Sequence, residues 1–274
     1  MVSCIGSGNM GLALMKGAAS VVSPREIGFS DADKSKAKAA AASIGAGVFA
    51  SNIEALQKGD YVFLAVKPQV LKEVLQELAP ALKERLSAES SGGRPFCLVS
   101  MAAGWSIEKL QDCLGVKAPL VRIMPNTPSL ISRGLIVMAC SAEVSDECCC
   151  ELEKILSGAG LVDCMEERYM DAVTGLSGSG PAFAYVFIQA LADGGVQAGL
   201  PRDKALHHAA QTVLGAAAMV LETGKDPGEL RDMVSSPGGT TVAGLAALER
   251  SGFSASAISA VEAAWRRSIE LGNN

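Results

Sequence analysis

A glycine-rich turn near the start of the sequence restricts the possible folds more than any other feature. The run at 6–11 reads G-x-G-x-x-G, with a predicted buried strand before it at 2–5 and a predicted helix after it at 12–19. Glycines at this spacing permit a tight turn, a close approach of a pyrophosphate to the backbone and close packing of the helix on the strand. The helix N-terminus also attracts phosphates. The pattern predicts a dinucleotide site, and the alternative is a structural turn that binds nothing.

Apolar runs alternate with helix-like segments through the first 165 residues. Further strands are predicted at 27–30, 48–49, 61–66, 96–101, 120–124, 135–139 and 161–164. Helices are predicted at 33–42, 52–58, 70–83 and 145–157, and a surface loop at 87–95. The run at 61–66 is continuously apolar, which suits a parallel strand covered on both faces. This alternation indicates an α/β fold with a doubly wound sheet and helices on both faces.

After about residue 166 the predicted strands stop. Helices are predicted at 167–173, 182–198, 202–223, 227–233, 242–250 and 255–271. We expect Ser179 to cap the second of these helices, with Pro181 in its first turn, and Thr240 or Thr241 to cap the fifth. The change from α/β to all-α predicts two domains, a dinucleotide-binding domain at 1–165 and a helical domain at 166–274.

The predicted helix that starts near Pro181 is apolar almost all round. Its polar residues Gln189, Asp193 and Gln197 form one narrow stripe. A helix of this kind should be buried, and a domain of about 110 residues can hardly surround it alone. We therefore expect a second copy of the chain to cover it.

Composition argues against several classes of partner. The 274 residues include 24 basic and 29 acidic residues, a net charge of −5, which argues against nucleic acid and against an anionic membrane. No signal peptide precedes the first predicted strand, and no uninterrupted apolar run is long enough to span a membrane. A cytoplasmic protein is expected. The eight cysteines lack metal-ligand spacing, so they are expected to be reduced thiols and no metal is predicted.

An acidic residue stands where dinucleotide-binding proteins hold a ribose. Asp31 follows the last glycine of the turn by 20 residues, where a carboxylate accepts the ribose hydroxyls of NAD. Ser30, Lys34 and Lys36 suit the 2′-phosphate of NADP instead. A carboxylate about 4 Å from that phosphate costs ~4 kcal/mol at an effective dielectric of about 20, so side-chain direction decides. The sequence leaves both coenzymes open, and Asp33 is expected to cap the next helix.

Four further loops suit ligand binding. Three follow predicted strands, at 65–68, 100–104 and 122–128, and the fourth is a Pro-Gly-Gly turn at 235–241 whose helix can present free N–H groups to a carboxylate. Taken alone, each loop is as well explained as a structural turn.

Four basic side chains are expected to have structural roles. The side chains of Lys67 and Arg122 are expected to be solvated or salt-bridged. His207 and His208 are adjacent on a predicted helix, so they are assigned surface or packing roles. Without a nucleophile motif or a carboxylate pair, hydride transfer fits best, because the coenzyme supplies the difficult step.

Five motifs, taken in order, resemble the pyrroline-5-carboxylate reductase family. They are the glycine turn, Ala65-Val66-Lys67-Pro68, the run at 122–128, the run T-G-L-S-G-S-G-P at 174–181 and the turn at 235–241. The resemblance covers nearly the whole chain and implies reduction of 1-pyrroline-5-carboxylate to L-proline by NADPH or NADH, the last step of proline biosynthesis. It also implies a Rossmann domain followed by a C-terminal helical dimerisation domain, which forms a homodimer and often a decamer.

The resemblance also implies which residues form the site. The expected coenzyme-binding residues are Gly6, Ser7, Gly8, Asn9, Met10, Gly11, Ser30, Asn52, Ala65, Val66, Lys67, Pro68, Ala102, Ala103 and Gly104, together with Asn126, which is expected near the nicotinamide. Asp31 is added to them because of its spacing from the glycine turn. The expected substrate-binding residues are Val234, Ser235, Ser236, Pro237, Gly238, Gly239, Thr240 and Thr241, and Thr241 is expected to hydrogen-bond the ring nitrogen. Two departures are Gly11, where the family usually has Ala, and the lack of an Arg after Ser30, which leaves the coenzyme preference open.

Two other functions remain as alternatives. A β-hydroxyacid dehydrogenase has similar domains but needs a Lys or His at its substrate, and the helix from Pro181 carries no Lys. A catalytically inactive NAD(P)-binding sensor has no need of the complete turn at 235–241.

Overall fold

The computed structural model describes residues 1–90 and 95–273. Two compact units divide them: Met1–Gly178 together with Ala264–Asn274, and Ser179–Ala263. The first unit therefore includes the segment at 166–178, which the sequence assigns to the helical domain, and the last turns of the chain. The domain boundary at 165/166 stays a prediction based on where the strands end.

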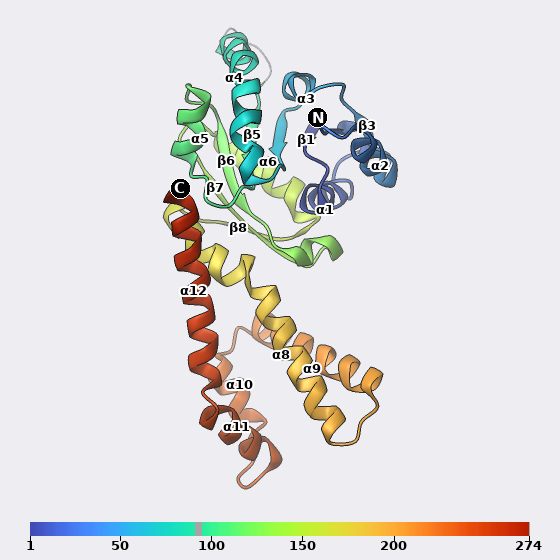
Figure 1. Ribbon diagram of the computed structural model, residues 1–274, viewed down its shortest axis with the longest axis vertical. Helices are drawn as coiled ribbons and strands as arrows, with labels where there is room; N and C mark the ends of the chain where they lie inside the picture. The colour runs from blue at the N-terminus through green and yellow to red at the C-terminus, as the bar shows by residue number, and fades with distance from the viewer. Residues whose placement is uncertain (91–94, 274) are drawn as a thin grey trace. The chain divides into compact units, whose positions relative to one another are not determined.

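An eight-stranded sheet forms the centre of the first unit within the described residues (Figure 1). Its strands are β1 (Val2–Ile5), β2 (Ile27–Ser30), β3 (Gly47–Val48), β4 (Tyr61–Leu64), β5 (Cys97–Ser100), β6 (Leu120–Met124), β7 (Gly134–Cys140) and β8 (Gly160–Cys164). Their order is β3-β2-β1-β4-β5-β6-β7-β8, and all neighbours are parallel except β6 and β7. The order reverses beside β1, where such sheets bind ligands at the carboxyl ends of their strands.

Helices cover both faces of this sheet, which confirms the predicted doubly wound fold. The helices are α1 (Asn9–Ala18), α2 (Lys34–Ile44), α3 (Asn52–Lys58), α4 (Pro68–Ser90), α5 (Ile107–Leu114) and α6 (Asp146–Ser157). Phe29 and Phe63 pack with α1, α2 and α6 on one face, and Val62 and Leu64 pack with α3, α4 and α5 on the other. The alternation along each strand thus produces two separate cores.

Several predicted elements of the first unit begin or end a few residues from the observed bounds, and two differences are larger. The helix α5 was not predicted, and α4 extends to Ser90 through part of the predicted loop at 87–95. Residues 91–94 of that loop lie outside the described residues. Short turns of helix also occur at η1 (Pro24–Glu26) and η2 (Thr127–Ile131).

Only helical segments follow the sheet in the part of the chain that the structure describes. The first unit continues with η3 (Glu167–Tyr169), α7 (Met170–Val173) and the π-helical turn η4 (Thr174–Gly178). The second unit contains α8 (Gly180–Gln197), α9 (Arg202–Thr223), α10 (Pro227–Met233), α11 (Thr240–Arg250) and the beginning of α12 (Phe253–Asn273), whose end belongs to the first unit. Among the helices of the described residues, none combines the length and apolarity needed to cross a membrane.

The side-chain caps predicted for two of these helices do not form. Ser179 occupies the N-cap position of α8, but its backbone angles are helical and its side chain makes no capping hydrogen bond; Pro181 lies in the first turn, as predicted. The cap of α11 is Gly239, in an extended conformation, so Thr240 and Thr241 lie inside the helix and neither caps it.

The second unit buries few side chains within the single chain. Its core consists of Ala192 on α8 with Ala205 and Ala209 on α9. Large apolar side chains on the same helices are exposed, such as Val186 at 72% and Leu221 at 79%. The predicted burial of α8 therefore does not occur within one chain, which agrees with a helix that another copy covers.

Candidate coenzyme and substrate sites

The glycine turn between β1 and α1 packs against the end of β4 and is open outward. Gly6 has φ 101°, and a Cβ added there would lie 2.5 Å from the Ala65 carbonyl oxygen. A Cβ at Gly8 would meet nothing within 4 Å. Gly8 is also the N-cap of α1, and no side chain caps this helix. Free N–H groups beside open space fit a dinucleotide pyrophosphate.

Asp31 is fixed against this turn. The backbone N–H and the hydroxyl of Ser7 both donate to Asp31 Oδ2 at 2.7 Å, and Asp33 N–H donates to Asp31 Oδ1 at 2.9 Å. Partial burial acts to raise the pKa of Asp31, but these hydrogen bonds and the charge of Lys36 outweigh it and lower that pKa. The carboxylate is therefore ionised at neutral pH.

The other groups near the end of β2 are also engaged. The Ser30 hydroxyl is buried and donates to Asn52 Oδ1 at 2.7 Å. The Asn52 amide in turn donates to Glu77 Oε2 at 2.8 Å, which links β2, α3 and α4. Nothing in the sequence indicates the role of Glu77, since it lies 25 residues from Asn52.

The basic residues of this region have partners of their own. Lys34 Nζ donates to the Ala50 carbonyl oxygen at 2.7 Å. Lys36 Nζ lies 3.9 Å from Asp33 Oδ2, and both side chains are exposed. Asp33 accepts hydrogen bonds from the N–H groups of Ser35 and Lys36 and caps α2, as predicted.

The loops after β4 and β5 lie at the same edge of the sheet. Leu64 pairs with Ser100, so the two loops leave neighbouring strands side by side. Lys67 is exposed, as predicted, and Ala102 is buried. An open pocket of about 840 Å³ lies beside them; its lining includes Pro68, Ala103 and Gly104. Most of its other lining residues belong to α4 and α5, so this hollow lies between those helices, and no residue of the glycine turn lines it.

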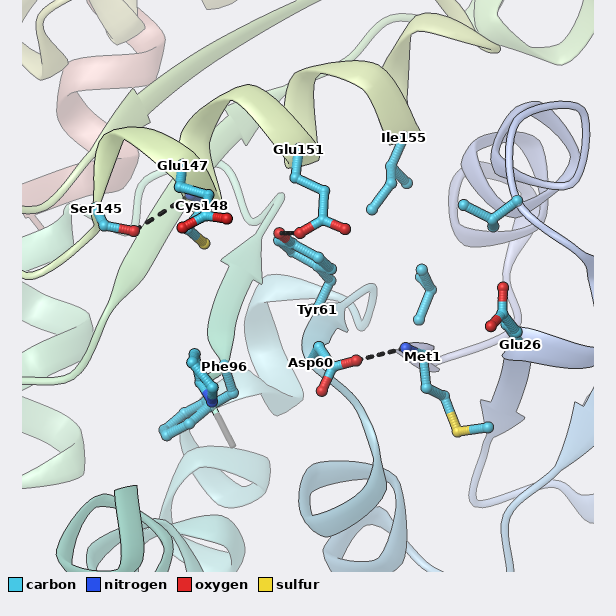
Figure 2. Close-up of a pocket in the computed structure, with 13 residues that line it drawn as sticks. Met1, Glu26, Asp60, Tyr61, Phe96, Ser145, Glu147, Cys148, Glu151 and Ile155 are labelled. Carbon is cyan, nitrogen blue, oxygen red and sulfur yellow. Dashed lines mark hydrogen bonds and ion pairs between the residues drawn. The ribbon is translucent and has the colours of Figure 1, made fainter. Parts of the chain in front are cut away.

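A second pocket, of about 450 Å³, lies elsewhere (Figure 2). It is formed at the start of β1 and β4, beside α6, where Tyr61 donates to Glu151 at 2.6 Å. Burial raises the pKa of Tyr61 above its usual value. This pocket lies at the amino ends of the strands and contains none of the predicted site residues.

Asn126 joins the loop after β6 to two other segments. Its amide nitrogen donates to the Ser177 carbonyl oxygen at 3.2 Å, and its amide oxygen accepts from Leu135 N–H at 2.9 Å. The side chain therefore connects β6, β7 and the π-helical turn η4. Its expected place near the nicotinamide stays a prediction.

Arg122 is salt-bridged, as the more conservative sequence interpretation expects. It is buried on β6, with Nη1 3.2 Å from Glu167 Oε1 and Nη2 3.8 Å from Asp171 Oδ1. The sequence does not identify these partners, because both lie more than 40 residues further along the chain.

The Pro-Gly-Gly turn belongs to the second unit. Gly238 has φ 71°, and Gly239 N–H donates to the Ser236 carbonyl oxygen at 3.0 Å. The Ser235 hydroxyl donates to the Arg231 carbonyl oxygen at 2.7 Å, which holds the turn to α10. No side chain caps α11, so the N–H groups of its first turn donate to no capping side chain, and most residues of the preceding loop are exposed. Such a turn suits a carboxylate.

No group of three or more His, Cys, Asp or Glu side chains within the described ranges has the geometry of a metal site. All eight cysteines are free thiols. Burial raises the pKa of Cys140 to about 12, which keeps its thiol protonated.

Two family models match the chain. Residues 167–271 match the family model described as "Pyrroline-5-carboxylate reductase dimerisation". Residues 1–87 match the family model described as "NADP oxidoreductase coenzyme F420-dependent".

Curated relatives match almost end to end. A pyrroline-5-carboxylate reductase from Glycine max is 43% identical and covers 97% of this chain and 94% of its own length. The corresponding Escherichia coli protein is 37% identical, with 98% and 97% covered.

Solved structures agree with these matches. A pyrroline-5-carboxylate reductase from Coxiella burnetii superposes with a TM-score of 0.88 at 32% identity, covering 98% of this chain and 97% of its own. A pyrroline carboxylate reductase from Plasmodium falciparum, solved with NADP bound, gives a TM-score of 0.84 at 30% identity, with 99% and 97% covered.

Proposed function

The chain belongs to the pyrroline-5-carboxylate reductase family, and we propose how its residues share the reaction of that family. The reaction is reduction of the imine of 1-pyrroline-5-carboxylate to L-proline with NADPH or NADH. The observation that carries the function is the match to these reductases over 97% of the chain, at 43% identity. This match leaves the two alternatives, a β-hydroxyacid dehydrogenase and an inactive sensor, without support of comparable weight.

The first unit binds the coenzyme in this proposal. The N–H groups at the start of α1 hold the pyrophosphate beside Gly8, where the structure leaves open space. Ser30, Asp31 and Asn52 stand at the adenosine ribose. The loops at 65–68 and 102–104 flank the dinucleotide, and Asn126 stands near the nicotinamide. The bound coenzyme supplies the hydride.

The turn at 235–241 binds the substrate carboxylate. Its support is the uncapped first turn of α11, which follows Gly239 and offers backbone donors to an anion. The Thr241 hydroxyl orients the ring nitrogen of the substrate. A protonated imine is already electrophilic at carbon, so the hydride adds there and the nitrogen keeps its proton as the amine. No strong acid from the protein is needed for this step.

The active form in this proposal is a homodimer made through the second unit. The support is the family model for dimerisation at 167–271 and the exposed apolar side chains of α8 and α9. Assembly of five dimers into a decamer and a cytoplasmic location complete the proposal.

Substitution of Thr241 tests the assigned role. Thr241→Val keeps the shape of the side chain and removes the hydroxyl, whereas Thr241→Ser keeps the hydroxyl. We expect Thr241→Val to lower kcat/KM for 1-pyrroline-5-carboxylate by about 10- to 100-fold, the value of one hydrogen bond to a charged group. Thr241→Ser should recover most of this loss, because it restores the hydroxyl oxygen that accepts a hydrogen bond from the protonated ring nitrogen.

Two results would contradict these assignments. Unchanged kcat and KM in Thr241→Val would remove Thr241 from the reaction. A wild-type protein that oxidises 3-hydroxy acids and leaves 1-pyrroline-5-carboxylate unreduced would refute the function itself.

A further inference from the structure

The side chains at the end of β2 decide between NADH and NADPH, because the two coenzymes differ only at the 2′ position of the adenosine ribose. We propose that Asp31 makes this chain select NADH over NADPH, since its fixed carboxylate accepts a ribose hydroxyl and repels a 2′-phosphate. The inference rests on the proposed function and adds the coenzyme preference, which the family match leaves open.

The first argument is the direction of the Asp31 side chain. Two groups of Ser7, each at 2.7 Å, and the backbone N–H of Asp33, at 2.9 Å, hold the carboxylate beside the glycine turn. A rotation away from a bound coenzyme would break all three hydrogen bonds. The carboxylate therefore stays at the end of β2, where Rossmann-type proteins hold the ribose.

The second argument is the remaining hydrogen-bonding capacity of Asp31. A carboxylate has about four acceptor sites, and three of them are occupied here. The free site is on Oδ1, where a ribose hydroxyl can donate. A 2′-phosphate has acceptors only and carries a charge of about −1.5 to −2 at neutral pH. It would place like charge beside a carboxylate whose pKa is lowered.

The third argument concerns the groups that would favour the phosphate. The Ser30 hydroxyl is buried and already donates to Asn52. Lys34 Nζ donates to the Ala50 carbonyl oxygen at 2.7 Å. Each of these groups would lose an existing hydrogen bond in order to bind a phosphate.

Lys36 is engaged in a different way. Its Nζ lies 3.9 Å from Asp33 Oδ2, and its charge also contributes to lowering the pKa of Asp31. A phosphate would compete with Asp31 for this cation, whereas the exposed Asp33, at 3.9 Å, holds Lys36 only weakly. The balance of charge at the end of β2 therefore opposes the 2′-phosphate.

The test is equilibrium binding of NADH and NADPH to the full-length protein without substrate, by titration calorimetry. We expect the wild type to bind NADH about tenfold or more tightly than NADPH. Asp31→Asn removes the charge at nearly constant shape. It should reduce the ratio of the two Kd values by about tenfold, chiefly through tighter binding of NADPH.

Asp33→Asn is the matched control. It removes the same charge two residues away, on an exposed side chain, and Asn also caps a helix well. The ratio of the Kd values should change less than about twofold in this variant. Asp31→Ser, a smaller uncharged side chain, should shift the ratio in the same direction as Asp31→Asn.

Three results would overturn the proposal. The first is that the wild type binds NADPH as tightly as NADH. The second is that Asp31→Asn leaves the ratio of the two Kd values unchanged. The third is that both Asp31 variants lose the same factor of affinity for NADH and for NADPH. The last result would show that Asp31 only maintains the glycine turn. The proposed function is tested separately. Reduction of 1-pyrroline-5-carboxylate with either coenzyme supports the function even if the NADH preference is absent. Selective NADH binding without this reduction refutes the function and leaves the preference standing.

Discussion

At the residue scale, two polar side chains of the proposed coenzyme site connect its loops to one another. Asp31 accepts hydrogen bonds from Ser7 across 24 residues of sequence, and Asn126 bridges the backbone of Ser177 and Leu135. Each residue therefore affects the shape of the ligand-binding edge as well as its chemistry. Loss of either side chain should alter coenzyme affinity even where it makes no direct contact.

Close backbone packing makes Gly17 sensitive to a single methyl group. A Cβ on Gly17 of α1 would lie 2.5 Å from Ala159 N and 2.6 Å from Ala159 Cβ. We expect Gly17→Ala to lower the free energy of unfolding by about 1–3 kcal/mol, although Ala is the better helix former. The measurement is urea unfolding followed by circular dichroism.

Lys16→Ala is the control for this variant, since Lys16 is the neighbouring exposed residue of α1. It should change stability by less than about 0.5 kcal/mol. A midpoint for Gly17→Ala equal to or above that of Lys16→Ala would show that the backbone can move apart at no cost.

The sequence predicts the positions of such residues better than their contacts. The 20-residue spacing from the glycine turn locates Asp31, because the length of one helix and one strand fixes it. The direction of its side chain depends on Ser7, and the partner of Asn52 is Glu77 on another helix. Spacing along the chain contains no information on either contact.

At the element scale, one buried arginine and its two acidic partners link five elements of the first unit. Arg122 on β6 contacts Glu167 of η3 and Asp171 of α7. Glu167 also accepts from Ile107 N–H at the start of α5, and Asp171 accepts from the Ser268 hydroxyl on α12. The segment that leads out of the sheet is thus fixed by charge-assisted hydrogen bonds.

Removal of this arginine should destabilise the first unit. We expect Arg122→Met to lower the free energy of unfolding by about 1–3 kcal/mol, because Glu167 and Asp171 lose their shared cation while remaining two-thirds buried. Arg122→Lys should lose less, since it keeps the charge but not the forked geometry. Denaturant unfolding of the three proteins measures both effects.

Arg168→Ala provides the comparison. Arg168 is bonded to Glu166 at 2.9 Å, but both side chains are about two-thirds exposed. An exposed pair contributes about 1 kcal/mol or less. Equal losses for Arg168→Ala and Arg122→Met would mean that burial adds nothing to the Arg122 pairs.

Element type was more predictable from the sequence than element ends. The strands β1, β2 and β6 have the predicted bounds, because each is a short, mostly apolar run that is followed at once by Gly6, Asp31 or Pro125. The helix α5 was missed because it has only 8 residues, although Ser106 before it is a cap that the sequence displays. At α11 the cap is the backbone of Gly239, which side-chain rules do not detect.

At the scale of the whole molecule, the second unit needs a partner to bury its apolar surface. Its own core of three alanines is small beside the exposed side chains of α8 and α9. The sequence anticipates this need from the composition of α8. It does not reveal that the end of α12 belongs to the first unit, since the sequence predicts one helix at 255–271 and gives no sign of a division within it.

A charge placed on the exposed apolar face of α8 should weaken the assembly. Val186 is 72% exposed in the single chain, and burial of a glutamate against a partner would be costly. We expect Val186→Glu to sediment as a smaller species than the wild type at micromolar concentration. Gln197→Glu adds the same charge to the polar stripe of the same helix and should sediment as the wild type does.

An unchanged sedimentation coefficient for Val186→Glu would exclude this face of α8 from the interface. Dissociation of both variants would indicate a general effect of charge on the second unit, and the specific role of the apolar face would be refuted.

The first unit is assembled from two distant stretches of one polypeptide. Ser268 is 3% exposed within it, and the backbone of Leu271 closely approaches Gly104. A ribosome makes the residues up to 178 first, and it must then synthesise the entire second unit before the final helical turns emerge. Completion of the nucleotide-binding half during translation therefore waits for the last residues, so a stalled or truncated nascent chain leaves that half unfinished.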